Sequence, residues 1–284
     1  MAHPGTQSTG GPPPDLPPLP PGYRWQQYPP SPRQPPALDR TVAALRIEDD
    51  RPWGWRPVAL PMVTLIALIL ATVVISHTVH AGSDGRGIAL AAGINVGVEL
   101  LLAASVWLAG RELAARYGGW MRVFGWGRPV LADLPFAAAG FGIALAARFV
   151  VLIAANAATN GKAAEQSQNV SLDRVTVGEV ALLVFVAVIC APLIEELVFR
   201  GLLLRTFMRR MGFWPAAAAS SFIFAVFHTY EVDTLAGAVT LALAVGAMGL
   251  TNCALVRYSD RLSPGIAVHA TLNGLAVLLL VLIS

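Results

Sequence analysis

Charged side chains are scarce in this chain of 284 residues, since 13% are Asp, Glu, Lys or Arg and 55% are hydrophobic. A typical soluble domain carries about 25% charged residues. The mean hydropathy of +0.60 agrees with this contrast. We therefore expect an all-α, polytopic transmembrane helix bundle. The formal net charge of +3 does not indicate nucleic-acid binding, because the basic residues flank apolar segments.

Cysteine is nearly absent, and the two that occur, Cys190 and Cys253, both lie within apolar segments. We interpret them as small buried hydrophobic side chains. The chain has no CxxC zinc motif and too few cysteines for a disulfide framework. Three protease signatures are missing as well: the HExxH helix of zincins, a GxSG-type serine and paired aspartates in apolar segments.

Proline, in contrast, is concentrated at the start, with 13 prolines among the first 40 residues. No apolar segment there resembles a signal peptide. We expect residues 1–52 to form a disordered or polyproline II tail, and residues 53–284 to form the transmembrane domain. A solvated tail and a docking segment for a proline-binding partner are both open.

Apolar segments long enough to cross a bilayer, which takes about 20 residues, follow the tail. We predict about seven spans, of which the third and fourth are long enough to tilt or to extend beyond the bilayer. Their predicted ranges are 58–78, 88–109, 131–156, 176–200, 213–230, 235–256 and 264–283.

The basic residues predict the orientation of these spans. With the tail inside, sixteen lysines and arginines fall on the cytoplasmic side and three on the outside. An excess of Lys and Arg marks cytoplasmic segments. We therefore expect a cytoplasmic N-terminus.

Two adjacent glutamates, Glu195 and Glu196, lie in the fourth apolar segment. A charge at that depth costs roughly 2.5–3.5 kcal/mol on insertion scales. Glu196 and Arg200 are four residues apart and share a helix face, so they can form a structural ion pair. Glu195 is rotated by about 100° from Glu196. We predict that Glu195 is the reactive carboxylate; the alternative is that both acids only tie helices together.

Histidines occur in the next apolar segments. His228 lies one turn after Phe224, and His269 lies one turn before Asn273. If a helical hairpin turns near Met211, Glu195 is 16 residues before the turn and His228 is 17 after it, so they come level. An interfacial role for His228 is the alternative, and buried histidines and amides such as His269 and Asn273 can also simply link helices.

Two further ionisable residues, Glu99 and Arg148, lie within predicted spans. We interpret them as structural and expect them to pair with each other. A role in shaping the cavity is the alternative.

Three motifs arrive in order on successive apolar segments: Glu195-Glu196-x-x-x-Arg200, Phe224-x-x-x-His228 and His269-x-x-x-Asn273. The ordered set resembles the CPBP family of intramembrane proteases, which includes CAAX-processing endopeptidases and Abi-type or bacteriocin-immunity proteins. The resemblance covers roughly residues 175–280 and implies a protease-like core there.

The resemblance implies an endopeptidase that hydrolyses a membrane-associated or lipidated substrate, in a multi-pass protein of the bacterial plasma membrane. Glu195 and His228 would activate water, and His269 and Asn273 would line the oxyanion site, with Glu196 and Arg200 completing the set. We favour a mechanism without a cofactor. A metalloendopeptidase is the alternative, with a divalent metal such as zinc held by Glu195, His228 and His269.

The sequence leaves one different class of function open. A transporter or a partner-binding scaffold could use the same buried polar network without catalysis. Intact motifs favour the enzyme.

Overall fold

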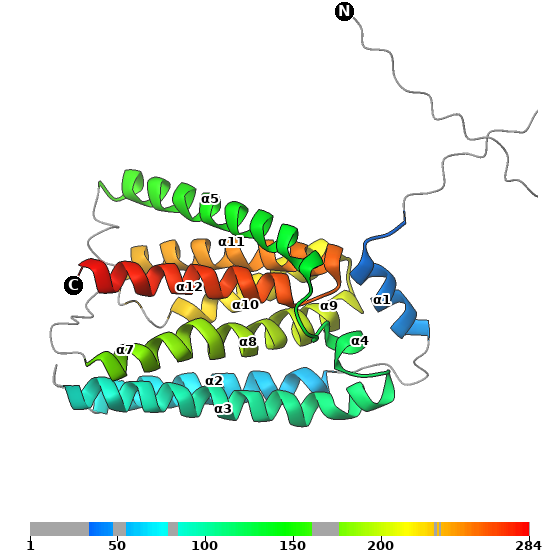
Figure 1. Cartoon of the computed structure of the whole chain (residues 1–284), viewed down its shortest axis with the longest axis horizontal. Coiled ribbons are helices and arrows are strands. Elements are labelled where there is room, and N and C mark those ends of the chain that lie inside the picture. Colours follow the sequence, from blue (N-terminus) through cyan, green and yellow to red (C-terminus); the bar gives the residue numbers. More distant parts are fainter. Residues whose placement is uncertain are drawn as a thin grey trace, which may run out of the picture. The chain divides into compact units, whose positions relative to one another are not determined.

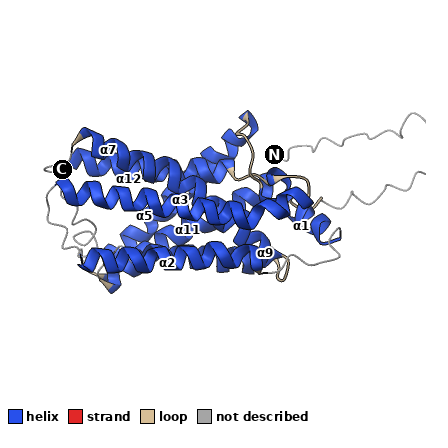
Figure 2. Cartoon of the chain, turned by 90° about the horizontal axis from the view of Figure 1, so that it is seen from below, coloured by secondary structure: helices blue, strands red, loops and turns tan. Residues whose placement is uncertain are grey.

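The structure is a computed structural model that describes residues 34–47, 55–78, 85–160, 176–229, 232 and 234–283. The chain divides into two compact units, Met1–Pro35 and Pro36–Ser284, and all of the described helices belong to the second. Every regular element in the described residues is helical, which confirms the predicted all-α fold. The long helices run along one common axis (Figures 1 and 2).

Each predicted span corresponds to a helix. Helices α2, α3 and α5 account for the first three, and α10, α11 and α12 for the last three. A continuous helix made of α7, η2, α8, η3 and α9 accounts for the fourth. The bounds are α2 Arg56–Thr78, α3 Gly85–Arg116, α5 Leu134–Ala158, α7 Val177–Val184, η2 Phe185–Cys190, α8 Ala191–Glu196, η3 Leu197–Leu204, α9 Arg205–Met208, α10 Phe213–His228, α11 Leu235–Ser259 and α12 Ser263–Ile283.

Three helical stretches are long and apolar enough to cross a bilayer by length and composition: Leu131–Ala158, Val180–Met208 and Leu235–Ser259. The first includes the 3₁₀ turn η1, Leu131–Asp133. Shorter apolar helices occupy Pro57–Ala71, Phe213–His228 and Ser263–Leu279. Together they support an integral membrane bundle.

The fourth helix ends at Met208 rather than at the predicted residue 200. Arg200 and Arg205 are two of the sixteen basic residues that the predicted orientation counts on the cytoplasmic side, but both side chains are buried in the bundle. Each has a partner, Glu196 for Arg200 and Asp260 for Arg205. Because the charges are matched inside the bundle, they do not end the helix.

Helix α11 lies at the centre of the packing and contacts α5, α10 and α12. Gly140 allows α5 to approach its neighbours closely, since a Cβ atom there would lie 2.5 Å from Cδ1 of Leu255 and 3.1 Å from Cγ2 of Val268. On the other side of the bundle, α2 pairs with α3, and α3 packs against the fourth helix. The helix crossings therefore fix the polar residues of α8, α10 and α12 against one another.

One end of the bundle is rich in arginine. We call it the basic end; α1 and the short helix α4 (Trp120–Phe124) lie there, at the right in Figure 1. The ends of α3 and α11 and the start of α12 meet there too. The arginines at this end include Arg116, Arg122, Arg128, Arg209, Arg210, Arg257 and Arg261.

Residues 37–47, which fall within the predicted disordered tail, instead form the helix α1 (Ala37–Ile47). Leu38, Val42 and Leu45 recur along one face of this helix and are buried. Asp39 and Thr41 hold it in place through Arg257 and Asp260 of the α11 end. The prediction of disorder is therefore wrong for this segment, because it carries its own apolar stripe. Of the rest of the predicted tail, the structure describes residues 34–36, and the other positions lie outside the described residues.

Candidate active site

The hairpin between α9 and α10 brings Glu195 and His228 level, as the residue spacing predicts. Nε2 of His228 lies 3.8 Å from Oε2 of Glu195. The Glu195 and His228 side chains keep 19% and 21% of their surface exposed. A polar pair at this separation has room for a bridging water molecule.

The second glutamate has a different environment. Glu196 is fully buried, and its Oε1 accepts hydrogen bonds from Nη1 of Arg200 at 3.1 Å and from Nδ2 of Asn252 at 2.9 Å. Nδ1 of His269 lies 3.2 Å from the same oxygen. Gly265 leaves room for this carboxylate, because a Cβ there would lie 3.2 Å from its Oε2. The predicted ion pair of Glu196 and Arg200 is therefore present, inside a sealed polar cluster.

Phe224 organises the cationic side of this cluster. Its ring is buried, and the guanidinium of Arg200 lies over it at 4.3 Å. The rings of His228 and His269 meet the same ring edge-to-face, with centroids 4.6 and 5.7 Å away. Phe224 therefore contacts both imidazoles, His228 from its own helix and His269 from α12.

The hydrogen bond of His228 constrains its protonation. Nδ1 lies 2.8 Å from the carbonyl oxygen of Phe224, which can only accept. In the neutral imidazole, Nδ1 therefore carries the proton and Nε2 is an acceptor. Oε2 of Glu195, which has no hydrogen-bond partner among the described residues, is also an acceptor when ionised. Two acceptors that face one another need a donor between them.

His269 connects the two glutamates. Its Nδ1 faces Oε1 of Glu196 and its Nε2 lies 3.7 Å from Oε2 of Glu195. The side chain is 2% exposed. When Nδ1 donates to Glu196, Nε2 can be a donor only in the protonated imidazolium.

Asn273 is held by an irregularity of the fourth helix. The π-helical segment η2 precedes Pro192, and the N–H of Ala191 donates to the carbonyl of Val186, five residues back. The next residue in this register is Pro192, which has no N–H to offer to the carbonyl of Ala187. Nδ2 of Asn273 donates to that carbonyl at 2.8 Å. One N–H of the amide is therefore engaged with the helix, and the second remains available.

Asn252 is a member of the cluster that sequence reasoning missed. It is fully buried on α11, and its Nδ2 donates both to Glu196 and to the carbonyl of Gly265 at 3.2 Å. It joins α8, α11 and α12 through one side chain. Its only sequence signal is an amide inside an apolar helix, with no partner at helical spacing.

The predicted pair of Glu99 and Arg148 does not form. Glu99 instead lies on α3, which packs against α8, the helix that carries Glu195. Oε2 of Glu99 is buried and has no hydrogen-bond partner among the described residues. Arg148 is exposed on α5, and α5 lies on the opposite side of the bundle from α3 (Figure 1). The prediction is wrong because opposite charge alone does not place two helices side by side.

A metal site is the alternative for Glu195, His228 and His269. In the described ranges, no three His, Cys, Asp or Glu side chains converge as metal ligands. Nε2 of His228 and Nε2 of His269 lie 3.8 and 3.7 Å from the same carboxylate oxygen, slightly more than the separation of about 3.3–3.6 Å between two ligands of a tetrahedral zinc. A chelator test decides between the two alternatives, and no step of the proposed chemistry uses a metal.

Comparison with known families supports the resemblance that the motifs carry. Residues 177–275, from α7 into α12, match the model of the Rce1-like type II CAAX prenyl endopeptidase family. All seven motif residues from Glu195 to Asn273 fall within this match, whereas Glu99 lies outside it. No curated protein and no solved structure matches the chain. The match supports a CAAX-type intramembrane protease at the level of the family.

Proposed function

We propose that this protein is an intramembrane endopeptidase in which Glu195 and His228 activate a water molecule. One observation carries the proposal: Nε2 of His228 and Oε2 of Glu195 face each other as two acceptors 3.8 Å apart. A water molecule satisfies both by donating one O–H to each. Its oxygen lone pairs are then free to attack a carbonyl carbon.

The first chemical step transfers a proton and forms a bond. Glu195 takes a proton from the water as general base while the water oxygen adds to the scissile carbonyl carbon. His228 accepts the second hydrogen bond and orients the water. The partial exposure of both side chains lets a peptide reach them, in contrast to the sealed Glu196.

The carbonyl oxygen becomes an oxyanion in this step. The donors that the geometry offers are Nε2 of protonated His269 and the second N–H of Asn273. Fixed donors aimed at a developing oxyanion stabilise the transition state in a site from which water is excluded. The buried carboxylate of Glu196 supports this role because it accepts from Nδ1 of His269.

The intermediate collapses when the carbon–nitrogen bond breaks. Glu195 returns its proton to the leaving nitrogen, which departs as an amine, and the carbonyl re-forms as a carboxylic acid. Glu195 is then ionised again, and the new carboxylic acid, which keeps the second proton of the water, loses that proton to solvent. No cofactor is consumed in this sequence of steps.

The substrate we propose is a membrane-associated or lipidated peptide. The site lies inside a bundle of apolar helices, so a peptide must enter from the bilayer or from its surface. The assay that tests the function is cleavage of such peptides by the purified protein in proteoliposomes. If the protein is a non-catalytic scaffold, no product should form at any protein concentration. That result would contradict the proposed enzymatic function.

We also propose that the basic end faces the cytoplasm of a bacterial cell, with the N-terminal tail on the same side. Without the buried Arg200 and Arg205, fourteen basic residues on that side against three on the other support this orientation. A cysteine introduced at Pro20 should react with an impermeant maleimide only in permeabilised cells. Labelling in intact cells would reverse the orientation.

A further inference from the structure

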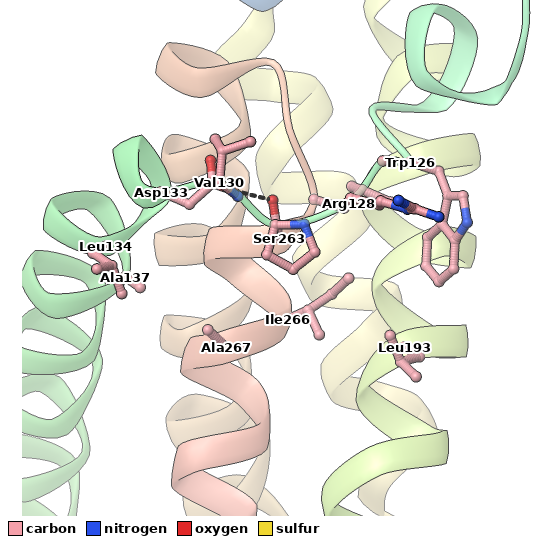
Figure 3. Close-up of a pocket in the computed structure, with 13 residues that line it drawn as sticks. Trp126, Arg128, Val130, Asp133, Leu134, Ala137, Leu193, Ser263, Ile266 and Ala267 are labelled. Carbon is pink, nitrogen blue, oxygen red and sulfur yellow. Dashed lines mark hydrogen bonds between the residues drawn. The ribbon is translucent and has the colours of Figure 1, made fainter.

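A large cavity lies beside the candidate active site, at the basic end. Its volume is about 590 Å³, within the range of roughly 300–1,000 Å³ typical of small-molecule sites. This chamber lies between α5, α8 and α12, below the segment from Trp126 to Val130 (Figure 3). Leu193 and Ile266 form part of its wall, three residues before Glu196 and His269. An occupant would therefore touch the helices that carry the site.

The wall of the chamber is apolar. Leu134 and Ala137 come from α5, Leu193 from α8, and Ile266 and Ala267 from α12 (Figure 3). Most of the polar side chains in the wall already have hydrogen-bond partners. Asp133 accepts from Ser263, from the N–H of Val130 and from Nε of Arg261, and Arg261 also donates to the carbonyl of Arg128.

Arg128 is the exception among the charges that line the chamber. Its side chain is exposed at the mouth and has no hydrogen-bond or ion-pair partner among the described residues. Leu131 and Leu134, close by on η1 and α5, are 84% and 62% exposed. An unpaired guanidinium beside an exposed apolar rim and Trp126 is the pattern of a membrane interface.

We propose that this chamber binds an anionic phospholipid, with one acyl chain between α5 and α12 and the phosphate on Arg128. A guanidinium offers paired N–H donors that match phosphate oxygens. Basic pockets between transmembrane helices bind anionic headgroups in this way. The proposal does not depend on catalysis, because Arg128, on which it places the phosphate, lies outside the residues that match the family.

The experiment uses the full-length protein in neutral detergent, titrated with phosphatidylglycerol or with phosphatidylcholine. A ligand that binds the folded state raises the melting temperature as its concentration rises. We expect phosphatidylglycerol to raise it and phosphatidylcholine to have less effect. Native mass spectrometry of the same samples should count one retained anionic lipid. Equal responses to the two lipids would overturn the proposal.

Two variants with matched controls test the two parts of the site. Arg128→Ala should weaken phosphatidylglycerol binding at least tenfold, whereas Arg111→Ala, an arginine at the same end that stacks on Trp107 outside the chamber, should not. Ala137→Phe should place a ring inside the chamber and weaken lipid retention, whereas Ala138→Phe, on the exposed face of α5, should not. Unchanged binding in Arg128→Ala would contradict the headgroup assignment.

A competing occupant is distinguished in the same assay. The competitor is a farnesylated peptide. If it displaces phosphatidylglycerol and binds the Arg128→Ala variant as well as the wild type, the chamber holds a substrate chain. That result would overturn the lipid assignment. Failure of the peptidase assay with intact lipid binding would affect only the proposed function.

Discussion

Glu195 and Glu196 are neighbours in sequence, yet they occupy two regions of opposite character. Glu196 lies in a sealed cluster in which Arg200, Asn252 and His269 all converge on one carboxylate oxygen. Glu195 lies on the partly open side, where its Oε2 faces two imidazoles at 3.7–3.8 Å without a hydrogen bond. A helix turns by about 100° per residue, so adjacent positions can serve different regions. The saturated carboxylate stabilises the fold, and the unsaturated one is free for chemistry.

The largest effect on turnover should come from changing Glu195 and His228, the two residues that hold the proposed water molecule. His228→Ala should lower turnover by about 10²–10⁴-fold, the usual contribution of a general acid–base group. The double variant with Glu195→Gln should be scarcely worse than either single variant, because the two residues act as a unit. Single-turnover cleavage of a lipidated peptide measures this. If the loss of turnover in the double variant equals the product of the two single losses, the two residues act independently.

Removing the sealed carboxylate should affect folding instead. Glu196→Ala leaves the buried guanidinium of Arg200 without its acceptor, and breaking a buried pair costs on the order of 3–5 kcal/mol. Glu195→Ala is the matched control at the neighbouring position. Melting temperatures in detergent should fall much further for Glu196→Ala. Equal melting temperatures of the two variants would show that Glu195 and Glu196 do not differ in their contribution to stability.

The oxyanion donors should give a slightly smaller effect on turnover. Asn273→Ala and His269→Ala should each lower it by about 10²–10³-fold, the effect of one lost oxyanion-hole donor. Asn273→Ala also leaves the carbonyl of Ala187 without its donor. Asn273→Asp is informative here, because it keeps the size of the side chain but replaces the N–H donors with acceptors. Full activity in Asn273→Asp would exclude the donor role.

The smallest effect is expected outside both regions, at the contact of α1 with α11. Asp39 and Arg257 pair at 2.9 Å with side chains 24% and 19% exposed. Exposed ion pairs contribute about 0.2–1 kcal/mol. Asp39→Ala should therefore change the melting temperature little and leave cleavage unchanged. A loss as large as that of Glu196→Ala would make α1 part of the core rather than an attached helix.

Much of the contrast between the two glutamates could be predicted from local spacing. The seven helices follow from the lengths of the apolar segments, and the pair of Glu196 and Arg200 follows from its four-residue spacing. The level positions of Glu195 and His228 follow from counting residues on either side of the turn. All three features depend only on the geometry of one helix or one hairpin.

The contacts that were missed depend on how distant helices pack. Asn252 reaches Glu196 across 56 residues, and only Gly265 on a third helix leaves space for the carboxylate. Glu99 does not pair with Arg148, because α3 packs against α8 whereas Arg148 is exposed on α5. The prolines around α1 led to a prediction of disorder for this segment, although the apolar stripe of Leu38, Val42 and Leu45 is visible in the sequence.

The most direct test of the proposed mechanism is the behaviour of Glu195→Gln and Glu196→Gln in one preparation of proteoliposomes. Both changes keep size and remove one carboxylate. We predict that Glu195→Gln melts like the wild type and loses about 10²–10⁴-fold in peptide cleavage, because only the base is gone. Chelators should leave wild-type cleavage unchanged. Undiminished cleavage by Glu195→Gln would contradict the mechanism, and cleavage lost to a chelator and restored by zinc would make Glu195, His228 and His269 metal ligands.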